Sequence, residues 1–261
     1  MQQEQLIKTL RDLKLSGMAD ALASQLEKPL NQDLSFEDRL ELMLNHELNN
    51  RQNRKIASSL KSAEFRQPAS AEDIIYKAER GLNKQQMLSL FSCDFIRKAH
   101  NVIITGATGC GKSYIASAIG HHACRLGFKV KYWHLPYQVD MLGFSHLDNT
   151  YLKQLKSLDK FDVLILDDFG CIKMSSRDRQ DLFTIIEGRH GFKSIIITSQ
   201  LPVKSWYDYL NEPTLADAMM DRILQNTHRI ELSGKSMRKA NTVIDYSMPQ
   251  ELATNAKNPW E

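Results

Sequence analysis

Hydrophobic and polar positions follow two different periods along this chain, and the change falls near residue 100. Between residues 2 and 63, apolar side chains recur every three or four positions, which is the period of amphipathic helices. From residue 101 onward, short continuous apolar runs alternate with longer stretches of helical period. Such runs are typical of buried parallel strands, so the pattern predicts a helical segment followed by an α/β segment.

The first segment is predicted to contain two short helices and one long helix. Leu6, Leu10 and Leu13 share one helical face, and a second face follows Gly17, which we expect to interrupt the pair. Residues 35–38 have the pattern of a capping box, and we expect the helix that follows to run to about residue 63. Its apolar stripe consists of Phe36, Leu40, Met43, Leu44 and Leu48.

The second segment alternates strands with helices. The predicted strands are residues 101–105, 129–134, 162–167, 193–199 and 228–232. The predicted helices are residues 113–126, 136–158, 176–190 and 214–226. Because helices join the strands, the sheet should be parallel and covered on both faces. Residues 69–100 form a connector, in which we expect a turn or short strand at 73–76 and a helix at 83–91.

A phosphate-binding motif lies between the first predicted strand and helix of the second segment. Its eight residues match G-x-x-x-x-G-K-[ST] at every fixed position: Gly106, Ala107, Thr108, Gly109, Cys110, Gly111, Lys112 and Ser113. Glycines let backbone N–H groups turn toward phosphate oxygens, and the helix N-terminus adds positive dipole. Lys112 would reach the β- and γ-phosphates, and Ser113 would hold Mg²⁺. The motif therefore predicts a nucleotide site.

Two acidic residues end the predicted strand 162–167. Asp167 and Asp168 would lie at the carboxyl edge of the sheet, where open α/β sheets bind their ligands. Asp167 would hold Mg²⁺ opposite Ser113, directly or through water. Asp168 would point at the γ-phosphate and orient an attacking water. A strand that merely ends in a polar turn is the alternative, and the preceding phosphate-binding motif speaks against it.

Two further residues have both a catalytic and a structural interpretation. Gln200 follows the strand 193–199, where its amide could hydrogen-bond the water or the γ-phosphate, or could simply cap the strand. Arg222 could pair with Asp217 or Asp221, or it could project into the nucleotide site of a neighbouring subunit. A guanidinium suits that second role because it is planar, permanently charged and bidentate. The residues alone leave both questions open.

The far half of the long predicted helix is basic. Residues 51–66 contain five cations and one acid, Glu64, which gives a local charge of +4; the cations are Arg51, Arg54, Lys55, Lys61 and Arg66. This surface is either a solvated helix end, where the dipole favours cations, or a contact for nucleic-acid phosphates. The first four cations are the candidates for DNA binding, although from the residues alone the solvated end is the simpler interpretation.

Composition narrows the class of protein only slightly. The chain has 261 residues, 42% of them hydrophobic, and a net charge of +3, which permits a nucleic-acid partner without requiring one. No apolar run approaches the roughly 20 residues of a membrane span. The four cysteines form no C-x-x-C pair, and the N-terminus has no signal-peptide core. We therefore expect a cytoplasmic protein with reduced thiols and no membrane partner.

Taken together, these motifs resemble the AAA+ ATPases of the initiator and helicase-loader group. More closely, the whole chain is similar to the IstB-like transposition helper ATPases of bacterial insertion sequences. Apart from the phosphate-binding motif and the LILDDFG stretch, the resemblance is carried by residues 13–18, 35–40, 47–51, the TSQLP stretch, 220–223 and 234–238.

The resemblance implies a parallel-sheet AAA+ domain with strand order 5-1-4-3-2, preceded by a small all-α module. The corresponding division is an N-terminal DNA- or partner-binding module at 1–67, a connector at 68–100, and an ATPase domain at 101–261. Since 39 residues follow Arg222, the helical lid of many AAA+ proteins should be truncated or absent.

The resemblance also implies a function. Such a protein binds and hydrolyses ATP with Mg²⁺, assembles as a homo-oligomer on duplex DNA, and helps a cognate transposase to choose or remodel its target. Arg222 matches the position of the arginine that acts in trans in that group. Because the family binds duplex DNA, the resemblance also favours the interpretation of the basic helix as a DNA contact. No element resembles a base-reading module, so we expect DNA binding without sequence preference. Asp168 and Gln200 stand where the family usually has Glu and Asn.

Two other functions remain open at this point. A replicative helicase loader has an almost identical ATPase core, so the N-terminal module and its partner would distinguish it from a transposition helper. A small-molecule P-loop kinase is the other alternative, but the chain has no evident acceptor pocket, and the Arg222 pattern speaks against it.

Overall fold

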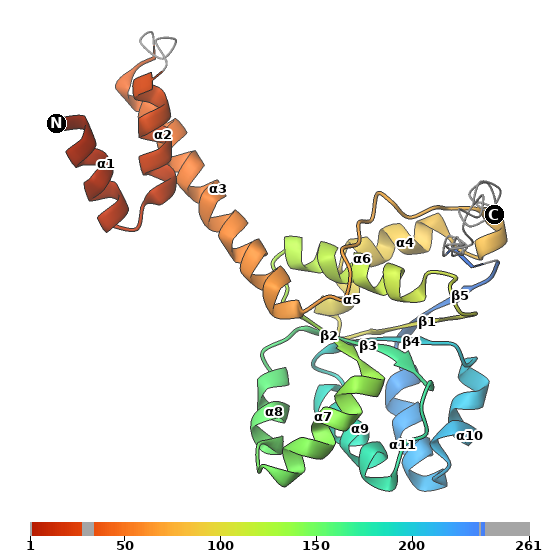
Figure 1. Cartoon of the computed structure of the whole chain (residues 1–261). Coiled ribbons are helices and arrows are strands. Elements are labelled where there is room, and N and C mark those ends of the chain that lie inside the picture. The colour runs from red at the N-terminus through yellow and green to blue at the C-terminus, as the bar shows by residue number, and fades with distance from the viewer. Residues whose placement is uncertain (1, 28–33, 235, 238–261) are drawn as a thin grey trace, which may run out of the picture.

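The computed structural model describes residues 2–27, 34–234, 236 and 237. A helical module at the N-terminus is joined by one long helix to a five-stranded α/β domain (Figure 1). Residues 235 and 238 of the stretch 234–238, which helps to carry the resemblance, lie outside the described residues. No helix among the residues described is long and apolar enough to cross a membrane.

Three helices form the N-terminal module: α1 (Gln2–Asp12), α2 (Ser16–Glu27) and α3 (Phe36–Ala63). The predicted capping box is present, because the side chains of Ser35 and Asp38 each accept a hydrogen bond from the other's backbone N–H. α3 runs from the module to the edge of the sheet at β2 (Figure 1). Its predicted end near residue 63 is confirmed, with a left-handed cap at Glu64.

The prediction that Gly17 separates the first two helices is wrong. The break lies at residues 13–15, and Gly17 is the second residue of α2. A Cβ atom on Gly17 would lie 2.7 Å from the Cα of Glu47, so the glycine allows α2 and α3 to approach closely. The predicted stripe on α3 is also largely uncovered, with 73% of Phe36 and 64% of Leu48 exposed.

Five parallel strands form the sheet, in the order β2-β3-β4-β1-β5. Read from the other edge, this is the expected order 5-1-4-3-2. The strands are β1 (Asn101–Gly106), β2 (Val130–His134), β3 (Val163–Phe169), β4 (Ser194–Ser199) and β5 (Thr227–Leu232). Their pairing brings the carboxyl ends of β1, β3 and β4 together at the middle of one edge.

Helices cover both faces of the sheet (Figure 1). One layer contains α4 (Lys84–Phe91), α5 (Asp94–Arg97) and α6 (Lys112–Arg125). The other contains α7 (Leu135–Leu147), α8 (Tyr151–Leu158), α9 (Ser176–Arg189), α10 (Trp206–Leu210) and α11 (Pro213–Leu224). Side chains alternate between two apolar cores: Val102 and Ile104 belong to the α6 side, and Ile103 to the opposite side.

Three details differ from the predicted elements. The single helix expected at 136–158 is two helices, α7 and α8, because Asp148 accepts hydrogen bonds from the backbone and hydroxyl of Thr150 and Asn149 has a φ of 60°. The short helix α10 was not predicted, and it buries Trp206 completely. The two 3₁₀ turns η2 (Ala78–Arg80) and η3 (Val203–Ser205) were not predicted either. Of the two alternatives for 73–76, the strand is absent, while residues 72 and 73 lie in a turn and 74–77 are irregular.

Candidate active site

A cavity of about 590 Å³ opens at the carboxyl edge of the sheet. It is lined by residues from the phosphate-binding motif, from the end of β3 and from the residue that follows β4; these include Lys112, Ser113, Asp167, Asp168 and Gln200. Predicted site residues from three separate parts of the sequence therefore share one cavity. Which of them act on a ligand remains a prediction.

The phosphate-binding loop, residues 106–113, joins β1 to α6 in the predicted way. Gly109 and Gly111 have φ values of 80° and 97°, a left-handed conformation that favours glycine. Lys112 is 6% exposed, and its Nζ donates a hydrogen bond to the carbonyl of Ala107 at 2.9 Å. The lysine therefore folds back over its own loop, and a bound triphosphate would have to replace this contact.

Arg80, which lies in the connector, stabilises the phosphate-binding loop. Its guanidinium donates to the carbonyl oxygens of Cys110 at 2.9 Å and Ile75 at 2.7 Å, and the residue is only 8% exposed. A Cβ atom on Gly111 would lie 3.0 Å from this guanidinium. The connector thus fixes the backbone of the loop, a role that could not be assigned from the pattern of residues alone.

Asp167 is buried in a small hydrogen-bond network. It is 1% exposed, and its two oxygens accept hydrogen bonds from Tyr132 Oη and Thr198 Oγ1, each at 2.5 Å. Burial raises the pKa of Tyr132, so this phenol stays a protonated donor. The Asp167 carboxylate and the Ser113 hydroxyl line the same cavity, and oxygen ligands of this kind suit Mg²⁺.

Asp168 has different surroundings. Its side chain is 25% exposed and its backbone is left-handed, with a φ of 63°. The backbone N–H donates to Thr198 Oγ1 at 3.1 Å, so one hydroxyl contacts both acids. Asp168 Oδ2 lies 3.4 Å from His134 Nε2 at the end of β2. The exposed carboxylate fits contact with a ligand or water better than the buried one.

Gln200 connects the loop after β4 to the phosphate-binding loop. Its Oε1 accepts a hydrogen bond from Thr108 Oγ1 at 2.7 Å, and its Nε2 donates to Cys171 Sγ at 3.5 Å. The simple strand-capping interpretation does not describe these contacts. The Nε2 amino group has two N–H donors. Its contact with Cys171 uses one of them, so the other can donate to a ligand.

Arg222 lies outside this cavity. It lines a second cavity with Asn101, the first residue of β1, and therefore lies near the amino edge of the sheet. Its guanidinium pairs with Glu187 of α9, donates to the carbonyl of Ala218 and sits 5.3 Å from the ring centre of Phe183. The local partner is thus Glu187, and neither Asp217 nor Asp221, the two partners that the structural interpretation named, is paired with it in the described residues.

Arg189, the last residue of α9, is too buried to reach the nucleotide site of a neighbouring subunit. It is 4% exposed, and its guanidinium donates to the carbonyl oxygens of Leu158, Phe161 and Ser194. Burial lowers its pKa to about 10, which still leaves it charged at neutral pH. These contacts join α8, α9 and β4, and they give the residue a structural role.

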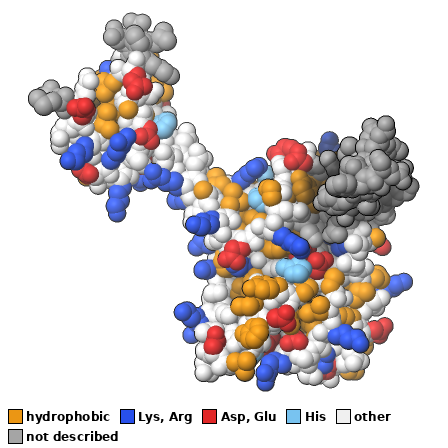
Figure 2. All heavy atoms as spheres, viewed as in Figure 1, with side chains coloured by type: hydrophobic (Ala, Val, Ile, Leu, Met, Phe, Trp, Pro, Cys, Tyr) orange, Lys and Arg blue, Asp and Glu red, His pale blue; other side chains and the backbone are white. Residues whose placement is uncertain are grey.

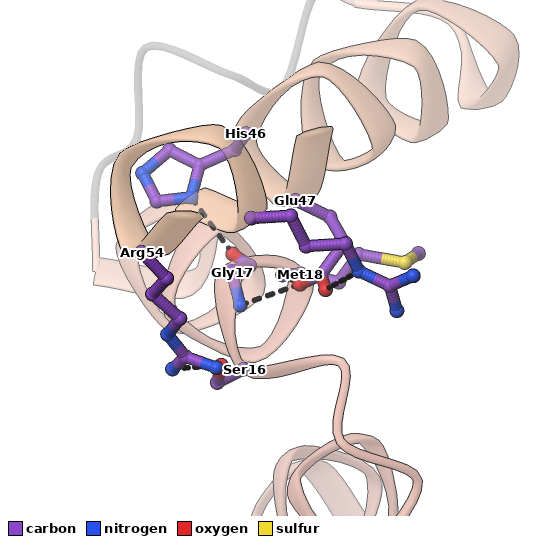
Figure 3. Close-up of polar contacts among 7 residues, drawn as sticks. Ser16, Gly17, Met18, His46, Glu47 and Arg54 are labelled. Carbon is purple, nitrogen blue, oxygen red and sulfur yellow. Dashed lines mark hydrogen bonds and ion pairs between the residues drawn. The ribbon is translucent and has the colours of Figure 1, made fainter. Parts of the chain in front are cut away.

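The four candidates for DNA contact on α3 differ in their surroundings. Arg51 Nε pairs with Glu47 Oε1 at 2.7 Å, and Arg54 donates to Ser16 Oγ at 2.5 Å (Figure 3). Lys55 and Lys61 are exposed and form no ion pair or hydrogen bond within the described part of the chain. Figure 2 shows Lys and Arg side chains following the long helix toward the sheet. The two lysines are therefore the freer cations of the four.

Tyr132, Thr198, His134 and Arg80 contribute to the site but were not predicted. His134 ends β2, Tyr132 lies two residues before it, and Thr198 lies in β4 beside the acidic strand. Their positions at this edge were a usable signal, because ligands bind where such strand ends meet. Arg80 lies in the irregular connector, where the sequence offered no comparable signal.

The known proteins that this chain resembles are named as ATP-binding proteins, which agrees with the nucleotide cavity described above. A family model described as IstB-like ATP binding protein matches residues 8–244. The insertion sequence ATP-binding protein y4pL of Sinorhizobium fredii is 39% identical over 230 residues, which cover 88% of this chain and 94% of that protein.

Solved structures resemble the chain in fold. The DnaC helicase loader has a TM-score of 0.52 and 19% identity, over 62% of this chain and 95% of that one. AMPPCP-bound DnaA from Aquifex aeolicus has a TM-score of 0.55 and 17% identity, over 65% of this chain and 51% of that one. At this level of identity, both show the AAA+ fold alone.

Proposed function

Because the chain belongs to the family of IstB-like ATP-binding proteins, we propose that it assembles on duplex DNA and assists a transposase in target selection or remodelling during transposition. The chain is an ATP-binding P-loop ATPase with an AAA+ fold. Its relative's name places that protein in an insertion sequence, and this supports the same context here. The single observation that carries the proposal is the cavity that joins the phosphate-binding loop to Asp167, Asp168 and Gln200 in a chain of this family.

The cavity residues divide the chemistry of ATP hydrolysis among them. Lys112 exchanges the Ala107 carbonyl for the β- and γ-phosphates, where its charge offsets theirs. Asp168 orients the attacking water through its exposed carboxylate. The Nε2 of Gln200 donates to the water or the γ-phosphate while Thr108 holds the other end of the amide. Mg²⁺, held by Ser113 and Asp167, would supply charge neutralisation.

Arg222 completes the site of a neighbouring subunit in this proposal. It lies near the amino edge of its own sheet, away from its own phosphate-binding loop, so it is free to act across a subunit interface. The pair with Glu187 holds the guanidinium in the isolated subunit, and it leaves 25% of the Arg222 side chain exposed. A homo-oligomer would therefore be the hydrolysing form, because each site needs an arginine from the next subunit.

Duplex DNA is bound by the module and α3 without reading the base sequence. Lys55 and Lys61 lie exposed along α3 and can each neutralise a phosphate. Arg51 and Arg54 lie on the same helix, but Arg51 pairs with Glu47 of α3 itself and Arg54 holds α3 to Ser16 of α2. Contacts of this kind position a protein on DNA and carry no sequence preference.

A replicative helicase loader is the second candidate. The fold likeness to the DnaC loader supports it, but that likeness covers 62% of the chain, whereas the insertion sequence relative matches 88%. The two functions share the ATPase core and differ in partner. An integrase-type transposase gene beside this one would favour the helper, and a replication gene would favour the loader.

The test of function is partner recruitment. Immobilised duplex DNA is loaded with the protein and ATP, then challenged with the neighbouring transposase or with a replicative helicase. We expect ATP-dependent retention of the transposase and no retention of the helicase, with the Lys112→Ala variant as the control that retains neither. Retention of the helicase alone would establish the loader instead.

A further inference from the structure

Arg66 lies in the nucleotide cavity, although the sequence groups it with the basic end of α3. α3 ends at Ala63, and Arg66 lines the cavity together with Lys112 and the two acids. The residue is exposed and forms no ion pair or hydrogen bond within the part of the chain that the structure describes. Tyr132 lines the same cavity, and the charge of Arg66 acts to lower the pKa of this phenol, against the larger effect of burial.

The backbone before Arg66 is fixed against the ATPase domain on two sides. Glu64 Oε2 pairs with Lys131 Nζ of β2 at 2.8 Å. The ring of Phe65 stacks on His121 of α6, with 4.1 Å between ring centres. α6 admits this ring because Gly120 has no side chain, and a Cβ atom there would lie 2.7 Å from it. Residues 64 and 65 therefore anchor the end of α3 beside the helix that begins at the phosphate-binding loop.

Other cavity-lining cations already have partners. Arg80 is bonded to the carbonyl oxygens of Ile75 and Cys110, and Lys112 is bonded to that of Ala107. Of the lysines and arginines that line this cavity in the described residues, Arg66 is the one without a hydrogen-bonded partner. An exposed guanidinium of this kind suits an anionic ligand, since it can donate two parallel hydrogen bonds to phosphate oxygens.

We propose that Arg66 contacts the phosphates of ATP bound in the same subunit, and that this contact couples nucleotide occupancy to the N-terminal module. The inference rests on the proposed ATP site. It adds to that site a residue that contacts the phosphates and a helix that connects the site to the N-terminal module. α3 has 28 residues and so spans about 40 Å, and a change in position at its anchored end is carried to the module at the other. Arg66 thereby has a role distinct from that of the four candidates for DNA contact.

The first experiment measures the affinities of ATP, ADP and adenosine by calorimetry. Arg66→Ala should weaken ATP binding by about tenfold or more, the usual effect of losing a charge-assisted hydrogen bond. ADP should be affected less and adenosine hardly at all, while Arg66→Lys should recover part of the ATP affinity. The matched control is Arg97→Ala, which removes an exposed arginine of α5 that pairs with Asp94.

The second experiment measures the coupling. Hydrogen exchange of the amides in residues 55–67 should slow when ATP is added to the native chain and to Arg97→Ala. In Arg66→Ala it should stay at the nucleotide-free rate even when ATP is saturating. Thermal unfolding at the native midpoint confirms that the variant is folded.

The outcomes separate this inference from the proposed function. If Lys112→Ala loses ATP while Arg66→Ala binds it as tightly as the native chain, the ATP site stands and the Arg66 contact is overturned. Equal losses of ATP, ADP and adenosine would also overturn it, since they would place the arginine on the base. If the native chain itself binds no ATP, the proposed function is contradicted, and the Arg66 contact, which rests on it, is contradicted with it.

Discussion

At the scale of single residues, Asp167 and Asp168 are adjacent in the chain but chemically distinct. Asp167 is buried and accepts two short hydrogen bonds, whereas Asp168 is partly exposed and has a left-handed backbone. The sequence predicted that both acids lie at the carboxyl edge of the sheet. It could not predict the difference between them, because Tyr132 and Thr198 come from two other strands.

The water-orienting role proposed for Asp168 predicts a separation of binding from hydrolysis. Asp168→Asn should bind ATP with native affinity but hydrolyse it about 10²–10⁴ times more slowly, because an amide cannot accept the proton of the water. Asparagine tolerates the left-handed backbone at this position, so the fold should be unaffected. Single-turnover hydrolysis and ATP affinity measured on the same preparation provide the test, and hydrolysis at the native rate would remove Asp168 from this role.

At the scale of elements, helical periodicity located α3 and its cap but not the side that it buries. Periodicity placed the apolar stripe on the covered face, yet the contact with α2 is made by Gly17 and Glu47 instead. Glu47 is 5% exposed, and it accepts hydrogen bonds from the N–H groups of Gly17 and Met18 at the start of α2 (Figure 3). A buried acid that caps another helix has no signature in the pattern of apolar residues.

This contact predicts a pH-dependent module. The hydrogen bond from Arg51, together with those from Met18 and Gly17, lowers the pKa of Glu47 below its ordinary value of 4.5. The contact therefore contributes its full stability above pH 4.5 and loses it as the pH falls through the lowered pKa. The amide chemical shift of Gly17 should titrate with a midpoint below 4.5, and Glu47→Gln should abolish this titration. A midpoint at or above 4.5 would contradict the assignment.

The exposed lysines of α3 predict how DNA binding depends on salt. Lys55→Gln with Lys61→Gln should weaken binding to all duplex sequences alike, and should reduce the slope of log affinity against log salt by about 2. These lysines have no partner among the described residues, so the variant should fold normally, whereas changes at Arg51 and Arg54 would also remove their contacts with Glu47 and Ser16. The control is Lys84→Gln with Lys160→Gln, which removes the same charge elsewhere.

Unchanged affinity and slope in the Lys55 and Lys61 variant would mean that this helix end is merely solvated. In that case the exposed lysines of the α/β domain become the next candidates, namely Lys153, Lys156 and Lys173.

At the scale of the whole molecule, most of the α/β domain could be predicted because its signals are local. Apolar runs located the five strands, and the phosphate-binding loop with its flanking strand and helix predicted the cavity. The strand order came from resemblance. The partner of Arg222 could not be predicted, because Glu187 lies 35 residues away on another helix and only the packing of α9 against α11 brings them together.

The shared-site proposal predicts complementation between two inactive variants. Arg222→Ala should bind ATP but hydrolyse it about 10³–10⁵ times more slowly, the range measured for arginine fingers, while Lys112→Ala should not bind it. A mixed interface can combine the intact Arg222 of one variant with the intact loop of the other, so mixing should restore part of the activity. If mixed assemblies form and stay inactive, Arg222 has only its local role beside Glu187.

The central claim is that ATP in the Lys112 cavity drives assembly of this chain on duplex DNA. Light scattering measures it most directly, on the native chain and on Lys112→Ala, each with a duplex of mixed sequence and with ATP, with ADP or without nucleotide. The account predicts a large increase in mass for the native chain only when ATP and the duplex are both present, and no increase for Lys112→Ala. A native chain that keeps its nucleotide-free mass, or a Lys112→Ala chain that assembles equally well, would contradict the account.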